Sequence, residues 1–244
     1  MIIVDSHAHL GSCRIFCVDY KSEDLIRRMD QYNIQISIVQ PHPGTDDPVS
    51  AHEAVAEMAV KYPGRIYGMA CFNPLLDEDD FVRKVTWAIK DLKFKAVKLH
   101  TNGYCVSPVH PGAKKLFKTA NDLNIPVMIH TGAGVPNALP SLCIQPAMEY
   151  PNLPIILAHA GAGIFTPEAV IAAKVCKNIY LETSWVNSLD TVPMVESVGA
   201  DRVMMGTDVP ENVSAEIHKY MTAGLTEDQL DYCLGKTAIN VFKI

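Results

Sequence analysis

Two histidines near the start of the chain are spaced to bind one ligand together. His7 and His9 lie two residues apart, just after a short apolar run. On an extended strand, side chains two residues apart point to the same side. Two neutral imidazoles that face the same way can hold one divalent metal ion. Because H-x-H alone is a weak signal, its interpretation depends on the rest of the sequence.

Further along the chain, three apolar runs also end in polar side chains. These runs lead directly into His130, His159 and Asp208, and turn-forming residues follow each of the three. A single histidine of this kind is usually a core residue that satisfies its own hydrogen bonds. Four histidines and one aspartate in matching positions indicate a shared chemical site instead.

The elements that must position these residues repeat along the chain. Short runs rich in Val, Ile, Leu and Met predict strands that are buried on both faces, as in a parallel sheet. Amphipathic segments such as 51–60 and 79–92 lie between them, and Thr226 begins another helix signal. The predicted strands are residues 2–4, 34–39, 66–70, 96–99, 125–129, 155–158, 179–181 and 203–205.

Eight alternating strands and helices predict an α/β fold, a single (β/α)8 TIM barrel domain over residues 1–244. In such a barrel, the carboxyl ends of the strands meet at one rim, which carries the chemistry. An open doubly wound sheet is the alternative. It usually binds nucleotides, but no G-x-G-x-x-G motif follows the first strand and no P-loop is present.

The composition limits the partners and the compartment. The 244 residues carry a net charge of −6, which offers no basic surface for nucleic acid or an anionic membrane. The first residues form no export segment, and no apolar run is long enough to span a membrane. The seven cysteines include no C-x-x-C pair, so we expect reduced thiols and a cytoplasmic protein.

The set of strand-end residues resembles the amidohydrolase superfamily. The shared features are H-x-H on the first strand, histidines on the fifth and sixth, and an aspartate on the eighth. The I-V-Q-P segment at 38–41 is similar to the family's second strand, and A-V-K-L-H at 96–100 matches its fourth. The resemblance spans nearly the whole chain and is closest to the amidohydrolase-related branch, which contains the aminocarboxymuconate-semialdehyde decarboxylase-like enzymes. G-K-T-A at 235–238 departs from the family's usual G-N-A.

This resemblance implies roles for the five strand-end residues. His7, His9, His130 and Asp208 would hold one divalent metal ion, and His159 would act beside it as an acid or base. Imidazole and carboxylate ligands suit zinc, and manganese and iron are also compatible. Zinc lowers the pKa of a bound water to about 7. Asp208 could then accept a proton and deliver it to a leaving group, so Asp208 and His159 are the expected catalytic residues.

Lys98 and His100 belong to the expected pocket as substrate-binding residues. Strand alternation places both opposite Val97 and Leu99, and therefore inside the barrel. Lys98 has three interpretations: a cation for a substrate carboxylate or phosphate, a rim lysine paired with an acid, or a carbamylated bridge. In the last case, a second metal ion would bind to His130 and His159 together with Lys98.

Three functions remain open. The leading expectation is a metal-dependent hydrolase that acts on a small amide, lactone, ester or similar bond. The first alternative is a non-oxidative decarboxylase of an aromatic or unsaturated acid, and the second is a metal-binding barrel without catalysis. A DNase-like barrel would carry a glutamate on strand four, where this chain has Lys98. The expected partner is a small-molecule substrate, and a homo-oligomer could form through the outer helices.

Other polar residues are weaker candidates for the site. Arg14, His42, His110 and Trp185 lie in predicted loops at the rim, where substrate groups usually bind. His52 and His218 fall inside predicted helices and are not expected in the site.

Overall fold

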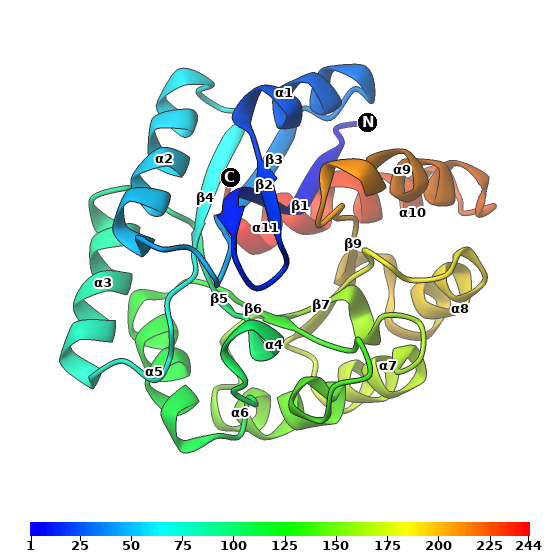
Figure 1. Cartoon of the computed structure of the whole chain (residues 1–244). Coiled ribbons are helices and arrows are strands. Elements are labelled where there is room, and N and C mark those ends of the chain that lie inside the picture. The colour runs from blue at the N-terminus through cyan, green and yellow to red at the C-terminus, as the bar shows by residue number, and fades with distance from the viewer.

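The sheet curls around a central axis and is surrounded by helices (Figure 1). The structure, a computed structural model, describes residues 1–244. The nine strands are β1 (Val4–Cys13), β2 (Val18–Tyr20), β3 (Ile36–Pro41), β4 (Ile66–Ala70), β5 (Ala96–Leu99), β6 (Val127–His130), β7 (Ile155–Ala158), β8 (Ile179–Glu182) and β9 (Val203–Met204).

Parallel pairing joins eight of these strands into a closed sheet. Neighbours from β1 through β3 to β9 are all parallel, whereas β2 is antiparallel to β1 at the outer edge. The two edges meet where the Ser6 N–H donates to the Met205 carbonyl at 3.1 Å. The Asp208 N–H donates to the His7 carbonyl at 2.7 Å. The predicted (β/α)8 barrel is therefore confirmed.

The helices follow the strands in alternation. They are α1 (Ser22–Gln31), α2 (Pro48–Lys61), α3 (Glu78–Lys90), α4 (Thr101–Tyr104), α5 (Lys114–Leu123), α6 (Ile144–Glu149), α7 (Thr166–Val175), α8 (Ser188–Val198), α9 (Val213–Thr222), α10 (Glu227–Asp231) and α11 (Thr237–Phe242). Thr226 is the N-cap of α10, where the sequence predicted a helix start, and it forms a capping box with Gln229. None of the helices is long and apolar enough to cross a membrane.

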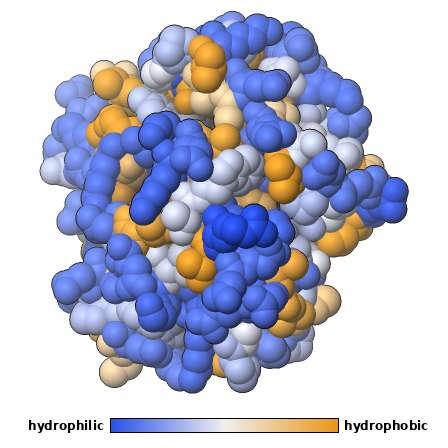
Figure 2. Space-filling model, turned by 90° about the vertical axis from the view of Figure 1, so that its left-hand side faces the viewer, coloured by the Kyte–Doolittle hydropathy of each residue, from blue (hydrophilic) through white to orange (hydrophobic).

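Strand alternation divides the apolar residues into two layers. One large cluster fills the space between the strands and the outer helices. For example, α2 buries Val55 and α3 buries Phe81 there, while the flank that carries these helices mixes hydrophilic side chains with scattered apolar ones (Figure 2). A smaller cluster inside the barrel includes Ile38 and Met128 and packs against Phe242 of α11. Apolar side chains thus fill the barrel interior below the polar rim.

The first strand differs most from its prediction. It was expected over residues 2–4, but β1 runs to Cys13 and folds back as a hairpin with β2, which was not predicted. The polar residues from Asp5 to His9 suggested an end to the strand. Their side chains are nevertheless buried, because His7 and His9 lie in the barrel rim and Asp5 and Ser6 form hydrogen bonds with residues 205–207. The seven cysteines are all free, as expected.

His52 is a structural histidine that should make the fold sensitive to acid. Its Nδ1 donates to the Pro48 carbonyl, and its Nε2 accepts from the Cys71 N–H at 2.9 Å. Burial lowers the pKa of His52 to about 4. An unfolded histidine has a pKa of about 6.5, so stability is lost as the pH falls from about 6.5 to 4, by roughly 3 kcal/mol in total.

Urea unfolding at pH 7 and pH 4 tests this expectation. His52→Gln should reduce the difference between the two unfolding free energies by roughly 3 kcal/mol. His218→Gln removes an exposed helical histidine and should leave the difference unchanged. Equal pH dependence in His52→Gln and the parent protein would contradict this role.

Candidate active site

A buried aspartate, Asp5, holds the first strand of the site in place. The Asp5 carboxylate accepts from the His7 N–H at 3.1 Å and from the Thr207 N–H at 2.9 Å. The Thr207 hydroxyl donates to it as well, at 2.7 Å. Burial raises the pKa of Asp5 to about 7. These bonds hold β1 against the segment after β9, and the pairing of β1 with β3 shifts register at this point. Two segments about 200 residues apart in sequence are thereby held together at the rim.

His7, His9 and Asp208 converge on one point. The Nε2 atoms of His7 and His9 lie 3.4 Å and 3.3 Å from Asp208 Oδ1. One ligand atom from each of the three residues lies within 4.8 Å of the others. Three of the four predicted metal ligands are thus within reach of a common centre.

His130, the fourth predicted ligand, lies beside this group. Its Nδ1 is 3.0 Å from His159 Nε2, and its buried Nε2 has no hydrogen-bond partner. Its ring stacks on His100 with centroids 4.7 Å apart. The His159 ring lies 5.1 Å from the His7 ring. All five strand-end residues therefore meet at the rim, although His130 stands outside the tightest group of three.

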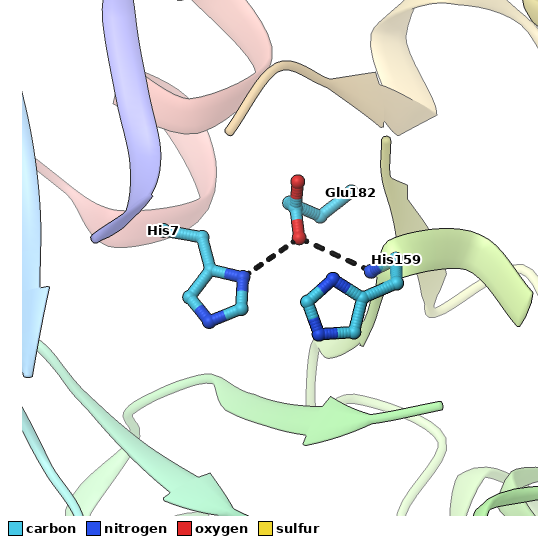
Figure 3. Close-up of side chains that lie close together, drawn as sticks. All are labelled: His7, His159 and Glu182. Atoms are coloured by element: carbon cyan, nitrogen blue, oxygen red, sulfur yellow. Dashed lines mark hydrogen bonds and ion pairs between the residues drawn. The ribbon is translucent and has the colours of Figure 1, made fainter. Parts of the chain in front are cut away.

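Glu182 organises these histidines, and our sequence analysis missed it. It ends β8 with no exposed surface and accepts from His7 Nδ1 at 2.9 Å and from the His159 N–H at 3.1 Å (Figure 3). A Cβ at position 206 would lie 2.6 Å from Glu182 Oε1, so Gly206 leaves room for the carboxylate. The signal was present in the sequence as an acidic residue directly after the apolar run 179–181.

One chain of hydrogen bonds fixes the imidazole tautomers. The Ser184 hydroxyl donates to Glu182 Oε2 at 2.9 Å, so its oxygen accepts from His159 Nδ1 at 2.8 Å. His159 Nε2 can then accept from His130 Nδ1. His130 Nε2 is left with a free lone pair. His7 donates through Nδ1 to Glu182, so its Nε2 also carries a lone pair, which faces Lys98 Nζ at 2.9 Å. A free lone pair on neutral imidazole is what a metal ligand requires.

Burial keeps five histidines of the site neutral. It lowers the pKa values of His7, His100 and His130 well below the usual value. It lowers the pKa of His159 to about 4 and that of His42 to about 3. Burial raises the pKa of Asp208, but the surrounding imidazoles outweigh this effect and hold its pKa well below the usual range. Neutral imidazoles thus surround an ionised carboxylate.

Lys98 lies inside the barrel, as strand alternation predicted. The side chain is fully buried, and its Nζ lies 2.9 Å from His7 Nε2. Burial lowers the pKa of Lys98 to about 8. The residue does not line the cavity at the rim, so its role as a substrate contact stays a prediction. His100, the other predicted substrate contact, does line that cavity.

Three site residues have strained backbones. His159, Trp185 and Asp208 have φ angles of +66°, +64° and +66°, in the left-handed region that residues other than glycine rarely adopt. Such strain concentrates at functional sites, where surrounding contacts maintain it. The Trp185 indole N–H donates to Asp208 Oδ2 at 2.8 Å.

The cavity above the histidines has a volume of about 310 Å³. Phe16 and Tyr20, from the β1–β2 hairpin, form one side of it, and no arginine or lysine contributes to its lining. The other lining residues are His9, Val18, His42, His100, Asn102, His130, Ala133, Asp208 and Val209. A cavity of this size and lining suits one small flat molecule.

The weaker candidates for the site divide into two groups. His42 lines the cavity, and Trp185 contacts Asp208. Arg14 instead pairs with Asp46 at the surface, and His110 caps a short helical turn. The last two do not contribute to the cavity lining.

The amidohydrolase family profile matches residues 27–244, most of the chain. The chain belongs to the amidohydrolase family. It is therefore an enzyme, and the resemblance seen in its strand-end residues is confirmed. A search of curated protein sequences found no match.

Solved structures share the fold over the full length of the chain. A TIM-barrel protein of Bordetella bronchiseptica is 17% identical, with 100% of this chain and 99% of the other covered and a TM-score of 0.83. The 5-carboxyvanillate decarboxylase of Novosphingobium aromaticivorans, with manganese and a nitrobenzoic acid, is 15% identical, with 100% and 96% covered and a TM-score of 0.81. A Polaromonas dihydroxybenzoic acid decarboxylase, with manganese and 2-nitroresorcinol, is 19% identical, with 99% and 97% covered and a TM-score of 0.75.

Proposed function

We propose that this enzyme is a metal-dependent decarboxylase of a small aromatic acid. The observation that carries the proposal is the rim cavity, which has about 310 Å³ and is lined by Phe16 and Tyr20 together with a cluster of imidazoles. Two similar structures are decarboxylases of substituted benzoic acids. The decarboxylase alternative therefore replaces the hydrolase as the leading hypothesis. We also propose that residues 1–244 form one catalytic domain.

A divalent metal ion fits the residues at the rim. His7, His9, His130 and Asp208 would hold it, because they offer neutral imidazoles, a carboxylate and the unpartnered Nε2 of His130. The similar decarboxylases contain manganese, so we favour manganese over the zinc expected from ligand chemistry alone. When bound, such an ion would withdraw charge from the substrate's oxygens and so favour loss of its carboxylate.

Asp208 is placed to carry the proton. It lines the cavity, whereas both ring nitrogens of His159 are engaged with Ser184 and His130. In the reaction, the ionised Asp208 carboxylate first takes up a proton from water, since its side chain is 19% exposed, and then gives this proton to the ring carbon that bears the substrate's carboxylate. The bond between this ring carbon and the carboxylate carbon then breaks, and its electron pair restores the aromatic ring. The carboxylate leaves as carbon dioxide. No oxidant is needed. His159 serves as a positioning residue for His130.

Trp185 should orient Asp208 for this proton transfer. Trp185→Phe removes the indole N–H that donates to Asp208 Oδ2, so we expect kcat to fall about tenfold while KM changes little. The control is Trp87→Phe, which alters the chain's other tryptophan, on α3. Equal kcat values for Trp185→Phe and the parent enzyme would show that the bond has no catalytic role.

Carbon dioxide release tests the proposed function. The manganese-loaded enzyme is incubated with a panel of hydroxybenzoic acids, and carbon dioxide and the corresponding phenols are measured. A parallel panel contains small lactones, esters and amides. We expect equal amounts of carbon dioxide and phenol from at least one acid. Hydrolysis in the second panel without carbon dioxide release in the first would restore the hydrolase hypothesis.

A further inference from the structure

One wall of the rim cavity consists of His42 and its aromatic neighbours. His42 follows the end of β3, is only 4% exposed and lies flat on His9, with ring centroids 4.2 Å apart and an interplanar angle of 10°. The ring of Tyr20 is 5.5 Å away and that of Phe16 is 6.4 Å away. This wall is separate from the side of the site where Glu182 and His159 form hydrogen bonds.

Four polar atoms of this wall have no protein partner. Both ring nitrogens of His42 are buried and unpaired, as are His9 Nδ1 and Gln40 Oε1. By contrast, His100 Nδ1 accepts from the Gly103 N–H at 3.0 Å. A buried polar group without a hydrogen-bond partner destabilises the fold by about 1–3 kcal/mol. A cluster of such groups therefore indicates a site that binds a polar ligand.

The chemistry of these atoms restricts what they can bind. A neutral imidazole offers one N–H donor and one acceptor nitrogen, and no cationic side chain lines the cavity. A carboxylate has only acceptors and could use only the N–H. A hydroxyl group both donates and accepts, so it can use both kinds of atom. The neighbouring rings of Phe16 and Tyr20 suit a hydroxyl that is carried on a flat ring.

We propose that His42 determines specificity by binding a hydroxyl substituent on the aromatic ring of the substrate. This inference rests on the proposed function and names the residue of this chain that recognises a ring hydroxyl. In this arrangement, one ring nitrogen of His42 forms a hydrogen bond with the hydroxyl while the imidazole face remains stacked on His9. The carboxylate of the substrate then faces the metal-binding side of the site.

Binding of two matched probes tests this proposal without turnover. 2-Nitroresorcinol and nitrobenzene differ only in two ring hydroxyls, and neither has a carboxylate to lose. Calorimetry on the metal-loaded enzyme gives the ratio of their dissociation constants. His42→Phe keeps a ring on His9 but removes both nitrogens, so the preference for 2-nitroresorcinol should fall about tenfold, as expected for one or two lost hydrogen bonds.

Three further measurements make the result decisive. His42→Gln restores a donor and an acceptor and should recover part of the preference. His110→Phe replaces an exposed histidine outside the cavity and should leave the preference unchanged. Metal content should be equal in the parent and His42→Phe enzymes. An unchanged preference in His42→Phe would overturn the proposal, and so would a loss of metal as the only effect of the substitution.

Failure of this inference can be told apart from failure of the proposed function. If His42→Phe keeps its preference while the parent enzyme releases carbon dioxide, only the role of His42 is wrong. If the parent enzyme hydrolyses lactones or esters and releases no carbon dioxide, the decarboxylase assignment itself is wrong.

Discussion

Asp208→Asn is expected to lower carbon dioxide release by about 10³-fold, within the usual range for loss of a positioned acid or base. The amide keeps the shape of the carboxylate but cannot carry the proton to the ring carbon. Its oxygen can still face His7 and His9, whose Nε2 atoms lie within 3.4 Å of the Asp208 Oδ1 position. The measurement is kcat at saturating manganese, together with metal content per chain.

The matched control for this variant is Asp46→Asn. Asp46 lies in a loop and pairs with Arg14 at the surface, so its substitution should leave kcat unchanged. If Asp208→Asn keeps its metal and also retains the parent kcat, another group must deliver the proton. A variant that loses its metal would be measured again at higher manganese concentration, where we expect the loss of kcat to persist.

Glu182→Gln is expected to weaken metal binding by about 10–100-fold, the usual effect of losing a carboxylate that orients a metal-binding histidine. The Glu182 carboxylate accepts from His7 Nδ1 and, through Ser184, sets the tautomers of His159 and His130. A glutamine amide offers only one acceptor oxygen, so it cannot satisfy all these donors. Titration of the metal-free protein with manganese measures the change.

Glu196→Gln provides a control for the loss of one negative charge. Glu196 is exposed on the outer side of α8, and we expect no change in metal affinity when it is replaced. Unfolding in urea at neutral pH verifies that Glu182→Gln remains folded. Wild-type metal affinity in a folded Glu182→Gln protein would show that this carboxylate does not orient the ligands.

The sequence was most informative where a strand is buried on both faces. Residues 66–70, 96–99 and 155–158 were predicted as strands and are strands with the same ends. Apart from Lys98, these runs carry no charged residue, because every side chain meets either the helices or the barrel interior. The end of β1 and the hairpin strand β2 lacked such a pattern, since Gly11, Ser12 and Asp19 carry no hydrophobic periodicity.

The site was predictable where polar residues end apolar runs. His7, His9 and Asp208 converge because parallel strands bring their carboxyl ends to one rim. Glu182 was missed because the predicted strand ended at residue 181, and the strand-end set included only histidines and one aspartate. The wall around His42 depends on the β1–β2 hairpin, which brings Phe16 to the cavity, and local sequence patterns do not specify that contact.

A crystal of the purified protein, with elemental analysis and an anomalous difference map at the rim, tests the central claim most directly. We expect one equivalent of a divalent transition metal, with a single anomalous peak within bonding distance of His7, His9, His130 and Asp208. The absence of a peak within bonding distance of these side chains would contradict the account. A second peak on a carbamylated Lys98 would contradict the one-metal site.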